Sequence, residues 1–140
     1  MHGRLFVAAT VLMLSTVSPI SAQDTASTST WAGYYVGIDA MDGSIDHLSI
    51  TPESGGTYKI RMTSTRLGHC QEGVGAGWIT ATARRVADDL VRENVVFQCA
   101  GSDDGGSLPD GMYVRDAITG ILTIEASGGR MNHYHPMGAD

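Results

Sequence analysis

Apolar and polar residues alternate along most of the chain from residue 31 onward, which is the pattern of β-strands that bury one face. The alternation is clearest in 57–63, where Tyr58, Ile60 and Met62 share one face of a predicted strand and polar side chains take the other. Glycine-rich turns interrupt the pattern at intervals of roughly 8–12 residues. We therefore expect short antiparallel strands joined by hairpins.

The individual strands are predicted from these alternating segments and from the turn residues between them. They are expected at 31–38, 45–50, 58–62, 78–83, 90–99, 112–116, 120–126 and 131–135, and 67–70 either continues one strand or begins another. Glycine, proline and aspartate predict turns at 42–43, 52–56, 73–77 and 127–130. The polar, glycine-rich stretch 101–111 is expected to be a long loop.

The segment 82–94 fits two kinds of structure. Some of its apolar residues also suit one face of a helix, namely Ala83, Val86, Ala87, Leu90 and Val91. Against a helix, Asp88-Asp89 predicts a turn, and the chain that follows is rich in valine, which strands favour. We expect two strands here.

Eight to ten short strands without a long crossover predict an all-β protein. The expected architecture is a small antiparallel up-and-down β-barrel, and a β-sandwich is the alternative. Consecutive hairpins favour the barrel, because closing the sheet removes the exposed edges that would otherwise pair with other chains.

Residues 1–22 have the features of a secretory signal peptide. Arg4 supplies positive charge near the start, the run 5–17 is apolar, and small residues follow it. A membrane-spanning helix would need about 20 apolar residues, and Pro19 comes too soon after this run. We expect the signal to be removed and the mature protein to be secreted or periplasmic.

The rest of the chain is long enough for one domain with one core. The polar segment 23–30 has no apolar period, so it is expected to be a disordered lead-in. The folded domain is expected to be a single unit over 31–140.

The chain has 2 cysteines, Cys70 and Cys99. In an exported protein, two cysteines most often form one disulfide, and a bridge between these two would close a large loop in the middle of the domain. The alternative is a pair of free thiols, but no Cys-x-x-Cys spacing supports a redox site. We expect a structural disulfide.

The charge balance excludes two classes of partner. The chain has 15 Asp and Glu against 9 Lys and Arg, and a formal net charge of −6. Nucleic-acid-binding proteins concentrate positive charge, as do proteins that dock on anionic lipid. We therefore expect no nucleic-acid partner, and no membrane association once the signal is removed.

No motif in the sequence identifies an enzyme. The glycine run 73–77 is similar to a nucleotide-binding loop, but Trp78 stands where that fingerprint needs glycine. Aspartates in 39–46 and 103–104 lack the spacing of helical-hand calcium loops and are expected to lie in turns, with an irregular calcium loop as the alternative. We predict a non-catalytic protein without a cofactor.

His133 and His135 are the candidate for a zinc or copper site. They are two residues apart on a predicted strand, so both rings should point to the same face. A third ligand, for which His47 and His69 are candidates, would complete a zinc or copper site. The simpler interpretation is two exposed histidines on a terminal strand, and we favour it.

Aromatic residues are spread over nearly all the predicted strands. A barrel of about eight strands is just wide enough to be filled by side chains or to hold one small ligand. The rings could simply form the core. Alternatively, they could line or floor a partly open pocket, for which we select Trp31, Tyr35, Tyr58 and Trp78.

The segment Trp31-Ala32-Gly33-Tyr34-Tyr35, at the head of a small exported meander, resembles the first strand of calycin-type barrels, the lipocalin and avidin superfamily. The resemblance implies that Trp31 closes the floor of a barrel. It also implies that an arginine, Arg115 or Arg130, packs on that ring. The resemblance covers this strand and the general layout, and implies no particular ligand.

These expectations lead to one predicted function and two alternatives. The leading hypothesis is an exported β-barrel that binds a small or extended apolar ligand through its open end. The first alternative is an interaction or inhibitor protein that acts on another secreted protein through its loops, chiefly 101–111. The second is a structural component of an extracellular layer, which would self-assemble.

Overall fold

The computed structural model describes residues 31–70 and 75–138, so the predicted signal peptide, 1–22, and the predicted lead-in, 23–30, lie outside the described residues. In the described part the strands are β1 Gly33–Ile38, β2 Ile45–Pro52, β3 Thr57–Ser64, β4 Gly77–Val86, β5 Asp89–Cys99, β6 Gly105–Ser107, β7 Gly111–Arg115, β8 Leu122–Glu125 and β9 Met131–Pro136. Two short 3₁₀ segments, η1 Ser54–Gly56 and η3 Ser127–Gly129, lie in turns.

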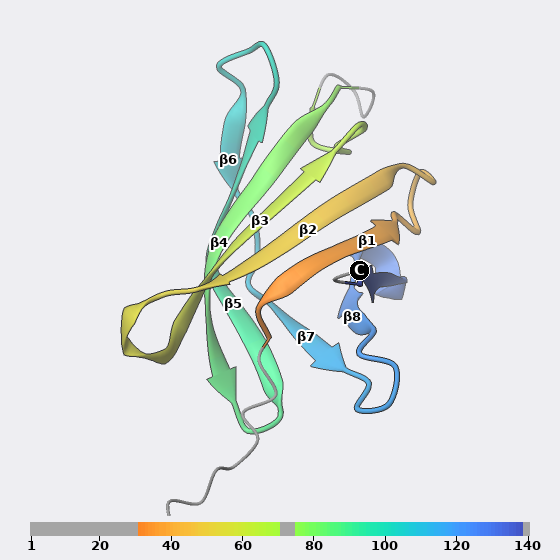
Figure 1. Cartoon of the computed structure of the whole chain (residues 1–140). Helices are drawn as coiled ribbons and strands as arrows, with labels where there is room; N and C mark the ends of the chain where they lie inside the picture. The colour runs from red at the N-terminus through yellow and green to blue at the C-terminus, as the bar shows by residue number, and fades with distance from the viewer. Residues whose placement is uncertain (1–30, 71–74, 139–140) are drawn as a thin grey trace, which may run out of the picture.

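The strands form a closed antiparallel barrel in which neighbours in the sheet are mostly neighbours in the chain (Figure 1). The order runs from β4 through β3, β2, β1, β9, β8 and β7 to β5, and the pairing of β4 with β5 closes the ring. The short strand β6 pairs only with β5. The predicted up-and-down barrel is therefore confirmed, and the sandwich alternative is wrong.

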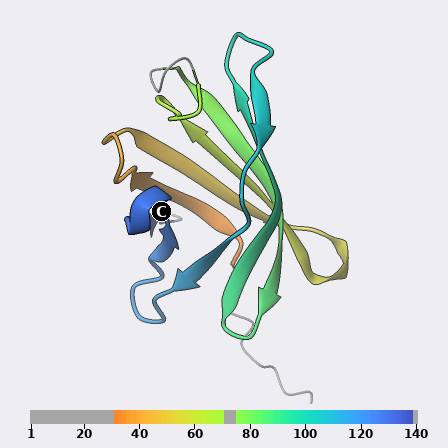
Figure 2. The same cartoon turned by 180° about the vertical axis from the view of Figure 1, so that it is seen from behind.

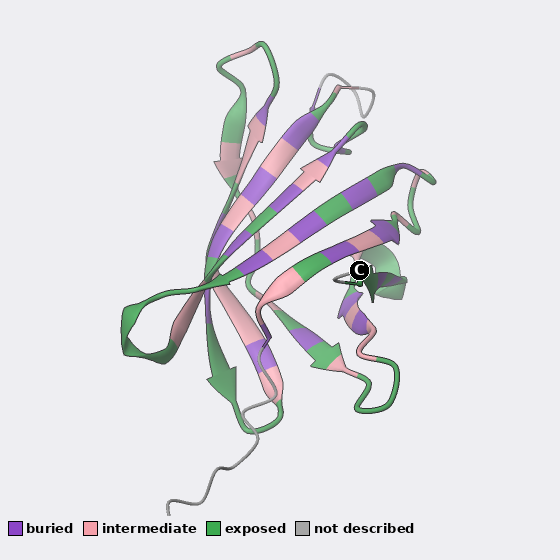
Figure 3. Ribbon diagram, in the orientation of Figure 1, coloured by how far each residue is buried: buried purple, intermediate pink, exposed green. Residues whose placement is uncertain are grey.

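Side chains alternate between the interior and the outer face along the strands, as the sequence pattern predicts (Figure 3). On β3, Ile60 and Met62 are buried, whereas Lys59 and Arg61 are exposed. The buried apolar residues form one core inside the barrel. Burial of this single continuous interior is the main driving force for the fold, although several large apolar side chains, among them Tyr34, Ile38 and Ile45, stay exposed on the outer face.

The segment 82–94 forms two strands, as expected. The hairpin between β4 and β5 turns at Ala87 and Asp88, and Ala87 has a φ of 54°. The predicted turn at Asp88-Asp89 is displaced by one residue, because Asp89 already pairs with Val86 across the hairpin.

Two other predictions of local structure were wrong. The segment 67–70 is not a strand but an irregular connection, in which the backbone N–H of Cys70 donates to the carbonyl of Leu67 at 2.8 Å. The predicted loop 101–111 contains strand β6. The backbone of Gly106 lies close to the ring of Phe97. This contact requires glycine, because a Cβ at position 106 would lie only 2.9 Å from that ring.

Cys70 and Cys99 form the predicted disulfide, with Cα atoms 5.5 Å apart. Both residues are buried, and the bridge ties the connection after β3 to the end of β5. Gly77 leaves the room for it, because a Cβ there would lie 3.1 Å from the Sγ atom of Cys70 and 2.7 Å from the carbonyl oxygen of Gln98. Within the described residues, no helix is long and apolar enough to cross a membrane.

The barrel has two different ends. We define the floor end by Trp31 and the connections 53–56, 87–88 and 116–121, and the open end by the connections 39–44, 65–70 and 126–130. Trp31 is buried at the floor end, and its carbonyl accepts a hydrogen bond of 3.0 Å from the hydroxyl of Tyr35.

The strand pairing around the barrel is shortest between β7 and β8. These strands share only the pairs Val114↔Thr123 and Arg115↔Leu122, near the floor end. Toward the open end, β6 follows β5 away from β8, which Figure 2 shows from behind. We call this gap in strand pairing the seam.

Candidate ligand-binding site

A pocket of about 680 Å³ lies at the open end and extends along the seam. Its wall includes residues of the connections after β1 and β3, residues on both sides of the seam, and side chains inside the barrel. The apolar part of the lining includes Met62, Leu67, Ile79, Leu108, Ile124 and Tyr134. This size is within the range of pockets that hold small organic ligands, roughly 300–1,000 Å³.

The strand register determines which residues form the apolar wall of the pocket. Met62 on β3 lies directly opposite Ile79 on β4, and both are buried on the inner face. The ring of Tyr134 on β9 lies over the neighbouring strand β1 because its partner there, Gly37, has no side chain, and a Cβ at position 37 would lie 2.8 Å from that ring. The wall is therefore built by alternation on the strands and by one glycine.

A buried carboxylate lies beside this wall. Asp46 on β2 is 1% exposed, and its Oδ2 atom accepts a hydrogen bond of 3.1 Å from the Tyr134 hydroxyl. Its Oδ1 atom has no hydrogen-bond partner among the described residues. Burial raises the pKa of Asp46, and hydrogen bonds from Ser64 and Tyr134 oppose the rise without cancelling it.

Two tyrosines connect this carboxylate with an arginine on the other side of the barrel. The rings of Tyr113 and Tyr134 pack edge to face, with centroids 6.2 Å apart, and the Cζ atom of Arg92 lies 5.9 Å from the centre of the Tyr113 ring. Burial raises the pKa of Tyr113, and the neighbouring charge of Arg92 opposes that rise. Burial also raises the pKa of Tyr134, so both phenols stay protonated donors.

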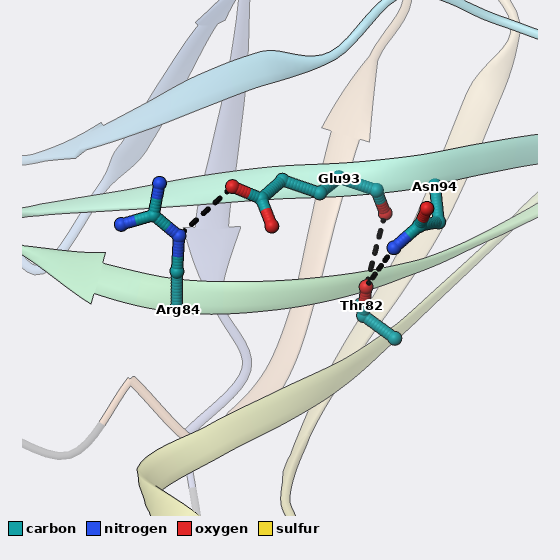
Figure 4. Close-up of polar contacts among 4 residues, drawn as sticks. All are labelled: Thr82, Arg84, Glu93 and Asn94. Carbon is teal, nitrogen blue, oxygen red and sulfur yellow. Dashed lines mark hydrogen bonds and ion pairs between the residues drawn. The ribbon is translucent and has the colours of Figure 1, made fainter.

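A bulge in β5 determines which of its side chains face inward. Thr80 on β4 pairs with Val96, but Thr82 pairs with Glu93, so β5 has one extra residue at this point. Asn94, in the bulge, has a φ of 54°, and its Nδ2 atom donates to the hydroxyl of Thr82 at 3.0 Å (Figure 4). The Thr82 hydroxyl in turn donates to the Glu93 carbonyl at 3.2 Å.

Because of this bulge, β5 presents side chains to the interior on both sides of it. Before it, Leu90 is buried and Arg92, two residues on, lines the pocket. After it, Val95 is also buried, three residues from Arg92. In an unbroken strand Val95 would lie on the face opposite to Arg92. An ion pair of 2.8 Å between Arg84 and Glu93 lies on the outer face beside the bulge (Figure 4).

The rim of the pocket is acidic. Asp39, Asp42, Asp110 and Glu125 line it. The two aspartates of the first connection also hold its backbone, because Asp39 accepts a hydrogen bond of 2.6 Å from the N–H of Met41 and Asp42 accepts one of 2.8 Å from the N–H of Ser44. Although burial raises the pKa of Asp42, its hydrogen bonds outweigh that effect and lower the pKa, so its charge persists at neutral pH.

The four aromatic residues predicted to line the site do not gather there. Trp31, Tyr35 and Tyr58 lie toward the floor end, and the described lining of the pocket includes none of them. Trp78 does not face the interior, because it precedes the buried Ile79 by one residue and so points to the other side of β4. Its ring lies on the outer face, 5.5 Å from the Cζ atom of Arg61. For Trp78 the expected placement was wrong.

His133 and His135 share one face of β9, as predicted, and both are exposed on the outer side of the barrel. The Nδ1 atom of His133 lies 3.2 Å from the hydroxyl of Thr123, a hydrogen-bond distance. His47 lies on the same face, since Val36 pairs with His47 on one side and with His135 on the other. In the described ranges, no three side chains of the metal-binding types come together.

Sequence reasoning missed the polar residues of the site, although part of the signal was present. Asp46 has the same parity as Leu48 and Ile50, so an inward carboxylate could have been inferred from the alternation alone. Arg92 likewise has the parity of Leu90. Charged residues on an apolar face are rare in a core and therefore informative.

Comparisons with known proteins add no assignment. No protein-family model matches the chain, and neither the curated proteins nor the solved structures give a match.

Proposed function

We propose that this chain is an exported, non-catalytic binding protein that holds a small, largely apolar ligand in the pocket at the open end. One observation carries the proposal: the pocket of about 680 Å³ has an apolar inner wall, on which Met62 and Ile79 lie side by side. Contact between water and such an apolar surface is unfavourable. An apolar ligand that displaces the water would therefore be stabilised by burial of its own surface and that of the pocket.

Export is part of the same proposal. It is supported by Arg4 and the apolar run 5–17 that follows it, and by the disulfide, which persists in oxidising compartments. The burial of Trp31 at the floor end agrees with what the calycin resemblance implies, and kinship with those barrels stays a prediction.

The test is binding of N-phenyl-1-naphthylamine, a neutral apolar fluorophore, to the mature protein. We expect one molecule to bind per chain. Leu108→Trp should fill part of the pocket and weaken binding roughly tenfold or more, the loss of one or two kcal/mol of contact. Val96→Trp is the matched control, because Val96 is exposed on the same strand pair and does not line the pocket.

Both variants are compared with the wild type by thermal unfolding, so that a loss of fold is not mistaken for a loss of binding. Absence of binding to folded wild-type protein would refute the pocket hypothesis and favour the alternative, an interaction protein. Equal binding by Leu108→Trp and Val96→Trp would place the fluorophore elsewhere and refute it as well.

A further inference from the structure

The pocket contains a positive charge that has no negative partner. Among its described lining residues, Arg92 is the only arginine or lysine. The two ion pairs found in the described ranges, Arg84 with Glu93 and Arg85 with Asp88, do not include it. Its Nε atom is buried and has no hydrogen-bond partner among the described residues.

The surroundings of Arg92 hold the guanidinium in this place. Gly111 on the neighbouring strand β7 pairs with Arg92 and has no side chain. A Cβ there would lie 2.8 Å from the Nε atom of Arg92 and 3.1 Å from the Cδ1 atom of Ile124. The ring of Tyr113 packs against its other side, and the guanidinium also donates a hydrogen bond to the Tyr113 hydroxyl. The side chain is therefore fixed between a glycine, an aromatic ring and the apolar wall of the pocket.

A buried donor without an acceptor destabilises the folded protein. Arg92 as a whole is only partly buried and lines the pocket, so its charge is accessible to a ligand. An acceptor that enters the pocket and bonds to this guanidinium would give its charge a partner. Planar carboxylates suit the purpose best, because a guanidinium can donate two parallel hydrogen bonds to them.

We propose that the natural ligand is an amphiphile with a single carboxylate, which binds Arg92 while its apolar part lies along Met62, Ile79 and Ile124. The inference rests on the proposed function, since it names the ligand of the same pocket. The acidic rim formed by Asp39 and its neighbours selects against ligands with several negative charges, because like charges repel most strongly near a surface of low dielectric constant.

The experiment measures displacement of N-phenyl-1-naphthylamine by three ligands of equal chain length: decanoate, 1-decanol and decylamine. The wild-type protein should bind decanoate most tightly. Arg92→Gln should weaken decanoate binding by roughly tenfold or more, the effect of losing a charged hydrogen bond, and should change decanol binding less than about twofold.

Two further variants keep the test decisive. Gly111→Ala should displace the guanidinium and also weaken decanoate binding selectively, even if Arg92→Gln does not fold. Arg84→Gln is the matched control: it removes one positive charge from the exposed face of the neighbouring strand, and its ligand affinities should equal those of the wild type.

The results separate this inference from the proposed function. If the neutral fluorophore binds but decanoate binds no better than decanol, or if Arg92→Gln weakens both alike, the carboxylate inference is wrong and the apolar pocket stands. Tighter binding of decylamine than of decanoate would show that the acidic rim selects the ligand and would also refute the inference. If the fluorophore itself does not bind, the proposed function fails first.

Discussion

Asp46 illustrates how a carboxylate is accommodated inside this barrel. Its side chain is 1% exposed, one oxygen accepts a hydrogen bond from Tyr134, and the other has no partner in the described chain. A charge in such a place is costly, and for that reason its pKa is raised.

At this scale we expect a pH-dependent effect of Asp46→Asn. In the folded protein Asp46 holds its proton more tightly than in the unfolded chain, so its contribution to the free energy of unfolding falls as the pH rises above 3.8, its ordinary pKa. The free energy of unfolding of the asparagine variant lacks this dependence on pH. Relative to the wild type, its free energy of unfolding should therefore increase with pH and level off above the raised pKa, as measured by urea unfolding over a pH series.

Asp116→Asn serves as the control with the opposite sign. Hydrogen bonds from the Thr119 and Ile118 backbone and the Thr119 hydroxyl lower the pKa of Asp116, so this group stabilises the fold more as the pH rises. A pH-independent difference between Asp46→Asn and the wild type would contradict the account of Asp46.

Among the elements, β5 connects most of the features of the molecule. It closes the ring with β4, pairs with both β6 and β7, carries the bulge that turns Arg92 and Val95 inward, and ends at the disulfide. The disulfide anchors the connection 65–70, in which Leu67 and His69 line the pocket. Loss of the bridge should therefore affect both stability and the pocket.

The prediction at this scale concerns the variant with Cys70→Ala and Cys99→Ala. The bridge joins residues 29 apart, and its removal should lower the free energy of unfolding by about 3–4 kcal/mol, mainly because the unfolded chain gains freedom. Urea unfolding measures this, and reduction of the wild-type protein should give the same change. An effect below about 1 kcal/mol would show that the bridge adds little to the fold.

On the scale of the whole molecule, the fold depends on closure between the first and last strands. β1 pairs with β9 over four residues, and the N–H of Met137 also donates to the carbonyl of Tyr34 at 2.8 Å. Without β9, the edges of β1 and β8 would be exposed, and the interior would lose the Tyr134 ring.

A chain that ends after Arg130 should therefore lose its cooperative thermal unfolding transition and aggregate. A chain that ends after Met137 keeps β9 and its bond to Tyr34, so its melting temperature should stay within about 2 °C of the wild type, as expected for changes outside the core. Cooperative unfolding of the shorter chain, observed by circular dichroism, would show that closure is dispensable.

Local patterns in the sequence determined the fold class, most of the strands and the disulfide. Alternation is a property of neighbouring residues, so Ile60 and Met62 are assigned to one face without any knowledge of the partner strands. The turn glycines and the two cysteines are likewise interpreted from their own chemistry, without knowledge of the tertiary structure. The parity of Asp46 and Arg92 was also present in the sequence.

The pocket was decided only by the tertiary structure. Its position depends on where β7 stops pairing with β8, on the bulge at Asn94, and on which end of the barrel each ring occupies. None of these follows from alternation, because strand register and bulges result from contacts between segments far apart in the chain. For the same reason aromatic residues alone were a poor guide: Trp31 and Trp78 are equally apolar, yet one is buried at the floor end and the other packs on the outer face.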